Sequence, residues 1–157
     1  MSKNPMERQG LSIAIARSEL EAICTHAEEG YPHEVVGVLA GSKRQNVISK
    51  AHALINERGE SKNRYKVGPL QLMRAEQALE AQGYDILGYY HSHPDHPARY
   101  SEYDKEHALP NLSYLIVSVQ KGEAGEIQSW RLREDRSAMD EEQLQMFTLD
   151  EAKESNH

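Results

Sequence analysis

The sequence predicts a single domain of the α+β class, in which a mixed and largely antiparallel sheet is flanked by helices. The chain has 157 residues, which is enough for one hydrophobic core but not for two folded domains. Apolar segments with the residue types of strands are interleaved with segments of helical periodicity. Several connections between the predicted strands are too short to contain a helix, so those strands are expected to pair in antiparallel fashion.

Seven short segments rich in apolar or aromatic residues have the character of strands. The clearest of them runs from Val35 to Ala40, where a nearly continuous apolar stretch closed by Gly41 indicates a strand buried on both faces. The predicted strands span residues 11–16, 35–40, 47–55, 65–67, 84–93, 112–119 and 125–132.

Three segments have the periodicity or the end signals of helices. Apolar residues recur at spacings of three and four in the first, which ends at Gly30. The second begins at Pro69 and is followed by Gly83, and the third stops before Pro110. The predicted helices span residues 17–29, 69–81 and 101–109.

The predicted domain spans residues 11–133, between a loose N-terminal tail at 1–10 and an acidic C-terminal tail at 134–157. The C-terminal segment has eight acidic and two basic residues, so it carries a net charge of −6 out of the −7 of the whole chain. Its acidity favours a solvated tail. The alternative is a short amphipathic helix that docks on the domain or on a second subunit, formed by Met139, Leu144, Met146, Phe147 and Leu149.

Composition argues against several classes of function. A net charge of −7 is unusual for a nucleic-acid-binding protein, which normally carries a basic surplus. No apolar run is long enough to span a membrane, and the polar N-terminus lacks the apolar stretch of a signal peptide, so we expect a cytoplasmic protein. The single cysteine, Cys24, excludes an intramolecular disulfide and zinc motifs built on several cysteines.

The H-S-H-P segment that begins at His91 carries the strongest signal of chemistry. Side chains alternate faces along a strand, so His91 and His93 point the same way and can bind one metal ion. Asp104, on the next short helix, can supply an oxygen ligand and leave a fourth position open, which is the arrangement of a catalytic zinc site. Taken by itself, a His-x-His pair is also a frequent coincidence on the surface of a strand.

Two further residues could complete such a site. Glu34 precedes the buried strand, where its carboxylate could lean over the metal without binding it, although an ordinary solvent-facing carboxylate would occupy the same position in the sequence. Ser101 and Asp104 also fit the S-x-x-D capping box, in which both side chains merely satisfy backbone N–H groups. Gly37 stands where the zinc motif H-E-x-x-H needs its second histidine, and the sequence has no G-x-S-x-G motif or P-loop.

Taken together, these residues resemble the JAMM (MPN-plus) zinc metalloprotease family. The H-S-H-P segment alone is a weak signal, but a serine and an aspartate at these offsets, with a glutamate before a glycine-containing apolar run, make it specific. Residues 32–41 and 93–99 look like the compact prokaryotic branch of the family, and the resemblance covers roughly residues 11–132. Tyr100 departs from close relatives, which often have proline before the serine.

The resemblance implies a mixed sheet flanked by helices, of the MPN and cytidine-deaminase-like kind, with one zinc ion per chain. It implies that His91, His93 and Asp104 bind the zinc, with water as the fourth ligand. It further implies that Glu34 is the general base, which takes a proton from that water and returns it to the leaving amine. Ser101 looks like the residue that helps to hold the oxyanion of the tetrahedral intermediate.

Relatives of this compact type cut after the C-terminal Gly-Gly of ubiquitin-like proteins and small sulfur carriers. The expected function is therefore zinc-dependent hydrolysis of the peptide or isopeptide bond that follows such a terminus. Two alternatives stay open: a non-catalytic protein-binding module of the same fold, and a zinc hydrolase of small peptides or amides. The expected partner is the ubiquitin-like or sulfur-carrier substrate, without nucleic acid or membrane, and the sequence does not distinguish a monomer from a homodimer.

Overall fold

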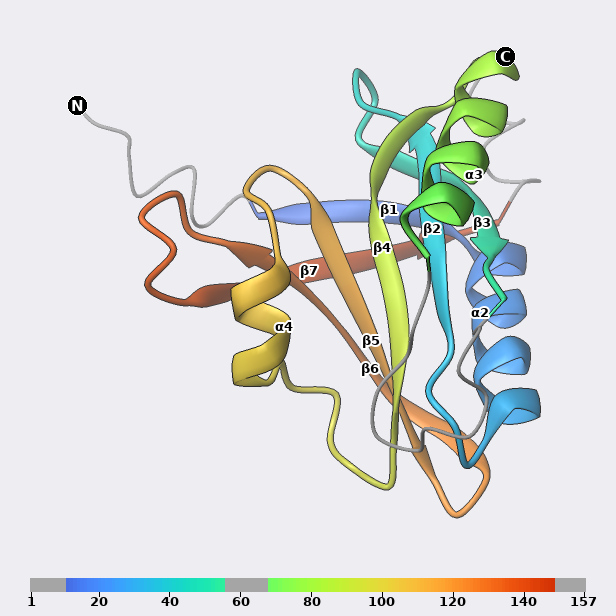
Figure 1. The fold of residues 1–157 in the computed structure, drawn as a ribbon, viewed down its shortest axis with the longest axis vertical. Coiled ribbons are helices and arrows are strands. Elements are labelled where there is room, and N and C mark those ends of the chain that lie inside the picture. Colours follow the sequence, from blue (N-terminus) through green and yellow to red (C-terminus); the bar gives the residue numbers. More distant parts are fainter. Residues whose placement is uncertain (1–10, 56–67, 149–157) are drawn as a thin grey trace.

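The computed structural model describes residues 11–55 and 68–148, and within them seven strands form one sheet that closes into a barrel (Figure 1). The order around the barrel is β1-β3-β2-β4-β5-β6-β7. The strands are β1 (Ser12–Ala16), β2 (Val36–Ser42), β3 (Val47–Ala53), β4 (Asp85–Pro94), β5 (Ser113–Gln120), β6 (Glu123–Leu132) and β7 (Met139–Phe147). The helices are α2 (Arg17–Gly30), α3 (Pro69–Ala81) and α4 (Glu102–His107).

The sheet is mixed, which confirms the predicted α+β class. Three strand pairs are parallel, namely β1 with β3, β1 with β7, and β4 with β5. The other four pairs are antiparallel. Closure of the sheet was not predicted, and the predicted N-terminal tail and the strand at 65–67 lie outside the described residues. None of the helices in the described ranges is long and apolar enough to cross a membrane.

The main hydrophobic core forms where α2 packs against the sheet. Ile23 and Ala27, on the apolar stripe of α2, are buried among side chains of β1 to β5 that include Ile15, Leu39 and Leu115. The stripe has the spacing of four residues that places two side chains on one helical face. These contacts bury α2 against the strands that lead to the functional site.

Two smaller clusters cover the opposite faces of the same strands. Val36 and Val38 of β2 pack with Leu79 of α3, which lies alongside β2 and β4 in Figure 1. Because Leu39 of the same strand faces the main core, β2 is buried on both faces, as its continuous apolar run predicted. A third cluster, around Trp130, packs beneath the segment that leads into α4.

A bulge in β4 sets the side of the sheet on which the histidines lie. The pairing with β2 shifts between Leu39 and Ala40, so one extra residue is inserted in β4 near Gly88. Gly88 also lies against the backbone of β5, where an added Cβ would be 1.8 Å from the carbonyl oxygen of Ser113. Beyond the bulge, Tyr90 faces the main core and His91 faces the opposite side.

The expectation that residues 134–157 form an acidic tail or a docking helix is wrong for the part that the structure describes. Strand β7 pairs antiparallel with β6 and parallel with β1, and so closes the barrel. The sequence pattern did not predict this strand, because Glu142, a charged residue, occupies a buried position with 2% of its surface exposed. Its carboxylate is held by three partners, Ser113 from β5 and Ser129 and Arg131 from β6.

Candidate metal centre and active site

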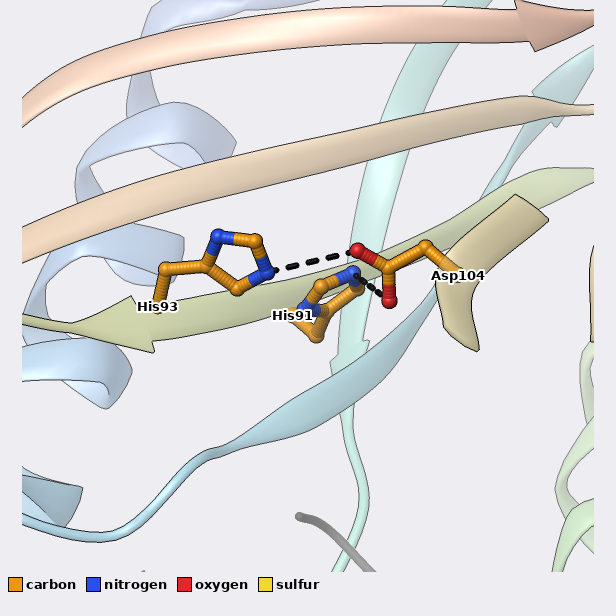
Figure 2. A group of neighbouring side chains, drawn as sticks. All are labelled: His91, His93 and Asp104. Carbon is orange, nitrogen blue, oxygen red and sulfur yellow. Dashed lines mark ion pairs between the residues drawn. The ribbon is translucent and has the colours of Figure 1, made fainter. Parts of the chain in front are cut away.

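Three side chains that could bind a metal converge at one point, although they come from two elements (Figure 2). His91 and His93 lie on β4, and Asp104 lies on α4. Oδ1 of Asp104 is 3.3 Å from Nε2 of His91, and its Oδ2 is 3.3 Å from Nε2 of His93. One possible ligand atom from each of the three residues lies within 4.8 Å of the other two. The three donors are therefore close enough together to bind one cation.

The capping box at the start of α4 orients the Asp104 carboxylate. The backbone N–H of Asp104 donates to Oγ of Ser101 at 3.1 Å, and the backbone N–H of Ser101 donates to Oδ2 of Asp104 at 2.9 Å. The capping interpretation of this pair is therefore correct as a local description. It is also compatible with a metal site, because the box holds the carboxylate in the direction of both histidines.

A backbone carbonyl in the loop after β4 fixes the ring of His93. Nδ1 of His93 lies 2.9 Å from the carbonyl oxygen of Pro97, which can only accept a hydrogen bond. Nδ1 must therefore carry the proton in the neutral ring, and the lone pair of Nε2 is left for a metal. Nδ1 of His91 has a longer contact, 3.4 Å, with the carbonyl oxygen of Ser92.

The electrostatics of the cluster favour an ionised Asp104. Burial acts to raise the pKa of the Asp104 carboxyl, but hydrogen bonds from His91 and His93 outweigh it and hold this pKa well below its ordinary value. Burial acts to lower the pKa of His93, but hydrogen bonds with Asp104 and Pro97 and the charge of Glu34 raise it above its ordinary value. The carboxylate is thus ready to bind a cation, while protons compete with a metal for His93.

Glu34 lies in the loop that enters β2, and two hydrogen bonds hold this loop against β4. The backbone N–H of Val35 donates to Oγ of Ser92 at 2.9 Å, and the N–H of Ser92 donates to the carbonyl of Val35 at 3.1 Å. The next residue, Val36, pairs directly with His91. The chain on both sides of Val35 is therefore fixed relative to the histidines.

A pocket of about 390 Å³ opens beside the cluster, at the low end of the size range of ligand sites. Glu34, His93 and Ser101 all line it, so the structure brings together all five residues that the sequence singled out. The remaining lining residues belong to the loop between β4 and α4: His96, Pro97, Arg99 and Tyr100.

A second pocket, of about 240 Å³, lies on the other side of the cluster. His91 lines it together with mainly apolar and aromatic side chains, among them Tyr89, Leu109 and Tyr114. Glu34 and Ser101 do not line this pocket. His93 thus lines the first pocket, and His91 lines the second.

Sequence reasoning did not assign a role to Ser92 or to Pro97. Ser92 could have been found, because the residue between two same-facing histidines must point to the opposite face of the strand, toward whatever packs there. The hydrogen bond from His93 to Pro97 gave no signal, since its acceptor is a backbone carbonyl in a loop.

Comparison with solved structures defines the class of the fold. A protein of Desulfitobacterium hafniense is 28% identical, with a TM-score of 0.74 over 87% of this chain and 93% of that one. A JAB1/MPN domain protein from Archaeoglobus fulgidus shares the fold at 21% identity, with a TM-score of 0.57 over 88% of this chain and all of that one. The barrel is therefore a JAB1/MPN fold, as the resemblance implied.

The family follows from sequence comparison. The family described as prokaryotic homologs of the JAB domain matches residues 16–133, and this chain belongs to it. The "Desampylase" of Haloferax volcanii is 35% identical over 111 residues, which cover 68% of this chain and 80% of that protein. A "Probable TtuB-protein conjugate cleaving protease" of Thermus thermophilus is 34% identical over 110 residues, which cover 70% and 72%.

Proposed function

We propose that this protein, a JAMM-type peptidase, uses zinc to hydrolyse the peptide or isopeptide bond after the C-terminal Gly-Gly of a ubiquitin-like or sulfur-carrier protein. The observation that carries the proposal is the convergence of His91, His93 and Asp104 beside a pocket that Glu34 and Ser101 also line. The names of the two relatives, a desampylase and a conjugate-cleaving protease, support a protein conjugate as the substrate.

The donor set fits zinc. Two imidazole nitrogens and one carboxylate oxygen are borderline and hard donors of the kind found in catalytic zinc sites, and three protein ligands leave a position for water. Zinc bound there would supply Lewis-acid polarisation of the scissile carbonyl and a water of lowered pKa. The chain's part is to hold, through Pro97, the neutral tautomer of His93 in which Nε2 has a free lone pair, and to present Asp104 as an anion.

Glu34 is the proposed general base. Its carboxylate lines the first pocket. Burial acts to lower the pKa of His93, and the negative charge of Glu34 is close enough to act in the opposite direction and raise it. In the proposed reaction Glu34 accepts a proton from the attacking water and then delivers it to the leaving nitrogen. Amide cleavage needs both transfers, because an unprotonated amide nitrogen is a poor leaving group.

Ser101 is proposed to stabilise the oxyanion of the tetrahedral intermediate. Its Oγ already accepts a hydrogen bond from the backbone of Asp104, which uses a lone pair and leaves the hydroxyl proton available. The capping bond also fixes the position of this oxygen at the edge of the pocket. The same hydroxyl can therefore cap α4 and donate a proton toward a developing negative charge.

The test uses a ubiquitin-like protein that ends in Gly-Gly, with a reporter peptide joined after the second glycine. We expect cleavage after the second glycine, loss of cleavage on chelation, and recovery with added zinc. Glu34→Gln should retain zinc and lose at least about 100-fold in rate. Glu21→Gln, on the exposed side of α2 where Glu21 pairs with Arg17, is the matched control and should keep full activity.

Each alternative function predicts a different result in this assay. A hydrolase of small substrates would cleave the free reporter peptide as fast as the fusion. A non-catalytic module would bind the fusion without cleaving it at any zinc concentration. Full activity of Glu34→Gln would contradict the role assigned to that glutamate.

A further inference from the structure

Arg99 is a charged side chain on the first pocket, and the mechanism above gives it no role. It is exposed and lines the pocket together with Glu34 and Ser101. Among the described residues, no ion pair or hydrogen bond engages its guanidinium. An arginine offers five N–H donors in a planar fork that matches a carboxylate. An arginine beside a pocket, without an acidic partner, is therefore suited to bind an anionic group of a ligand.

The carboxylates around Arg99 do not neutralise it. Asp95 and Glu102 lie within four residues of it in the chain, and Glu126 accepts a hydrogen bond from the adjacent residue. Each of them is held by other groups: Asp95 by Tyr31 and Lys121, Glu102 by Lys105, and Glu126 by Ala98 and Gln128. Glu34 lines the same pocket, but among the described residues no ion pair joins it to Arg99. The positive charge of Arg99 is thus left for a bound molecule.

The first pocket is the side of the site toward which the leaving group points. The general base must reach the leaving nitrogen to protonate it, so this nitrogen lies near Glu34. Glu34 and Ser101 line the first pocket but not the second. The scissile carbonyl then lies at the metal cluster beside Ser101, the Gly-Gly chain before it extends toward the second pocket, and Arg99 faces the part that leaves.

We propose that Arg99 is a specificity-determining residue, which favours substrates whose leaving amine carries a carboxylate close to the scissile bond. The inference rests on the proposed function and names the chemistry of one side of its substrate. The carboxylate could be the α-carboxylate of a single amino acid joined after Gly-Gly, or an acidic side chain next to a modified lysine. Arg99 makes no bond to the reacting atoms, and acts by binding the anion.

Two pairs of substrates distinguish these sources. In the first pair, a ubiquitin-like protein ending in Gly-Gly is followed by a single alanine, with either a free carboxylate or an amide. In the second pair, Gly-Gly is joined to the lysine of an amidated peptide with aspartate or asparagine next to the lysine. The readouts are the ratio of kcat/KM within each pair, and equilibrium binding of the same intact substrates to the Glu34→Gln variant.

We expect the zinc-loaded enzyme to favour the carboxylate by about tenfold in at least one pair, and that pair identifies the source. Arg99→Ala should bring the ratio close to one, in both rate and binding, and Arg99→Glu should reverse it. Arg44→Ala is the matched control, because Arg44 is an exposed arginine between β2 and β3, away from both pockets, and it should leave the ratio unchanged.

The outcomes separate this inference from the proposed function. Cleavage of all four substrates at equal rates, or an unchanged preference in Arg99→Ala, overturns the role of Arg99 and leaves the proposed function standing. Failure to cleave any Gly-Gly substrate in the presence of zinc overturns the proposed function, and the inference with it.

Discussion

Ser92 connects the two halves of the candidate site through a single hydroxyl group. It is fully buried between His91 and His93, and it points to the face of β4 opposite to theirs. Its Oγ accepts the hydrogen bond of the Val35 N–H, and so fixes the residue that follows Glu34. Strand β4 thus presents His91 and His93 on one face, and on its other face it holds the residue next to Glu34, the proposed base.

Replacement of Ser92 by alanine should separate metal binding from catalysis. The buried N–H of Val35 would lose its partner, at a cost of about 1–3 kcal/mol in the free energy of unfolding. The loop that carries Glu34 would then be less well fixed, so kcat should fall. Zinc affinity should change little, because the three donor atoms keep their positions. Urea unfolding, zinc titration and the cleavage assay measure the three effects.

Ser129→Ala is the control for Ser92→Ala. Ser129 is an equally buried strand serine, whose Oγ donates to Glu142 and which lines neither of the two pockets at the cluster. This variant should also lose stability but keep its activity. Equal loss of activity in the two variants would show that Ser92 acts only through global stability.

At the level of elements, the close approach of β4 and β5 holds the bulge that orients the histidines. Gly88 makes this approach possible, since any Cβ at this position would overlap the backbone of Ser113. The two strands are parallel neighbours, and β5 pairs with β4 along the whole length that carries His91 and His93. The register of the ligands therefore depends on a residue that has no side chain.

Gly88→Ala should destabilise the protein by about 1–3 kcal/mol or more, because β5 must move away from β4 to admit the methyl group. Zinc affinity should also fall, since the shift changes the strand that carries two of the ligands. Gly125→Ala in β6 is the control, because an added Cβ at Gly125 meets no atom within 4 Å. If the two variants unfold at the same urea concentration, the close approach of β4 and β5 at Gly88 does not contribute to stability.

The elements show which parts of the structure could be predicted and which could not. The β2 strand was predictable because its apolar run is continuous, and the His91 and His93 pair because a strand alternates its faces. The β7 strand could not be predicted, because Glu142 fills a buried position, whereas a carboxylate in a sequence normally indicates a solvent-exposed position. The closed barrel depends on the parallel pairing of β7 with β1, a contact between the two ends of the chain that has no local pattern.

For the whole molecule, the candidate metal centre lies outside the main hydrophobic core. The core is built from α2 and strands β1 to β5, whereas Asp104 belongs to α4 and its capping box. Asp104 also has ion-pair partners within the protein, His91 and His93. Metal removal is therefore expected to loosen α4 without unfolding the barrel, unlike small zinc domains that lose their fold without metal.

Chelation should accordingly lower Tm while the far-ultraviolet circular dichroism of the protein is retained. At a free zinc concentration 100 times Kd, the stabilisation is about 2.7 kcal/mol, which corresponds to about 5–10 °C for a chain of this size. This zinc-dependent shift should shrink as the pH falls through the raised pKa of His93, because a proton and zinc compete for Nε2. Asp104→Ala should show a much smaller response to zinc at any pH. Loss of secondary structure on chelation would instead mean that the metal holds the barrel together.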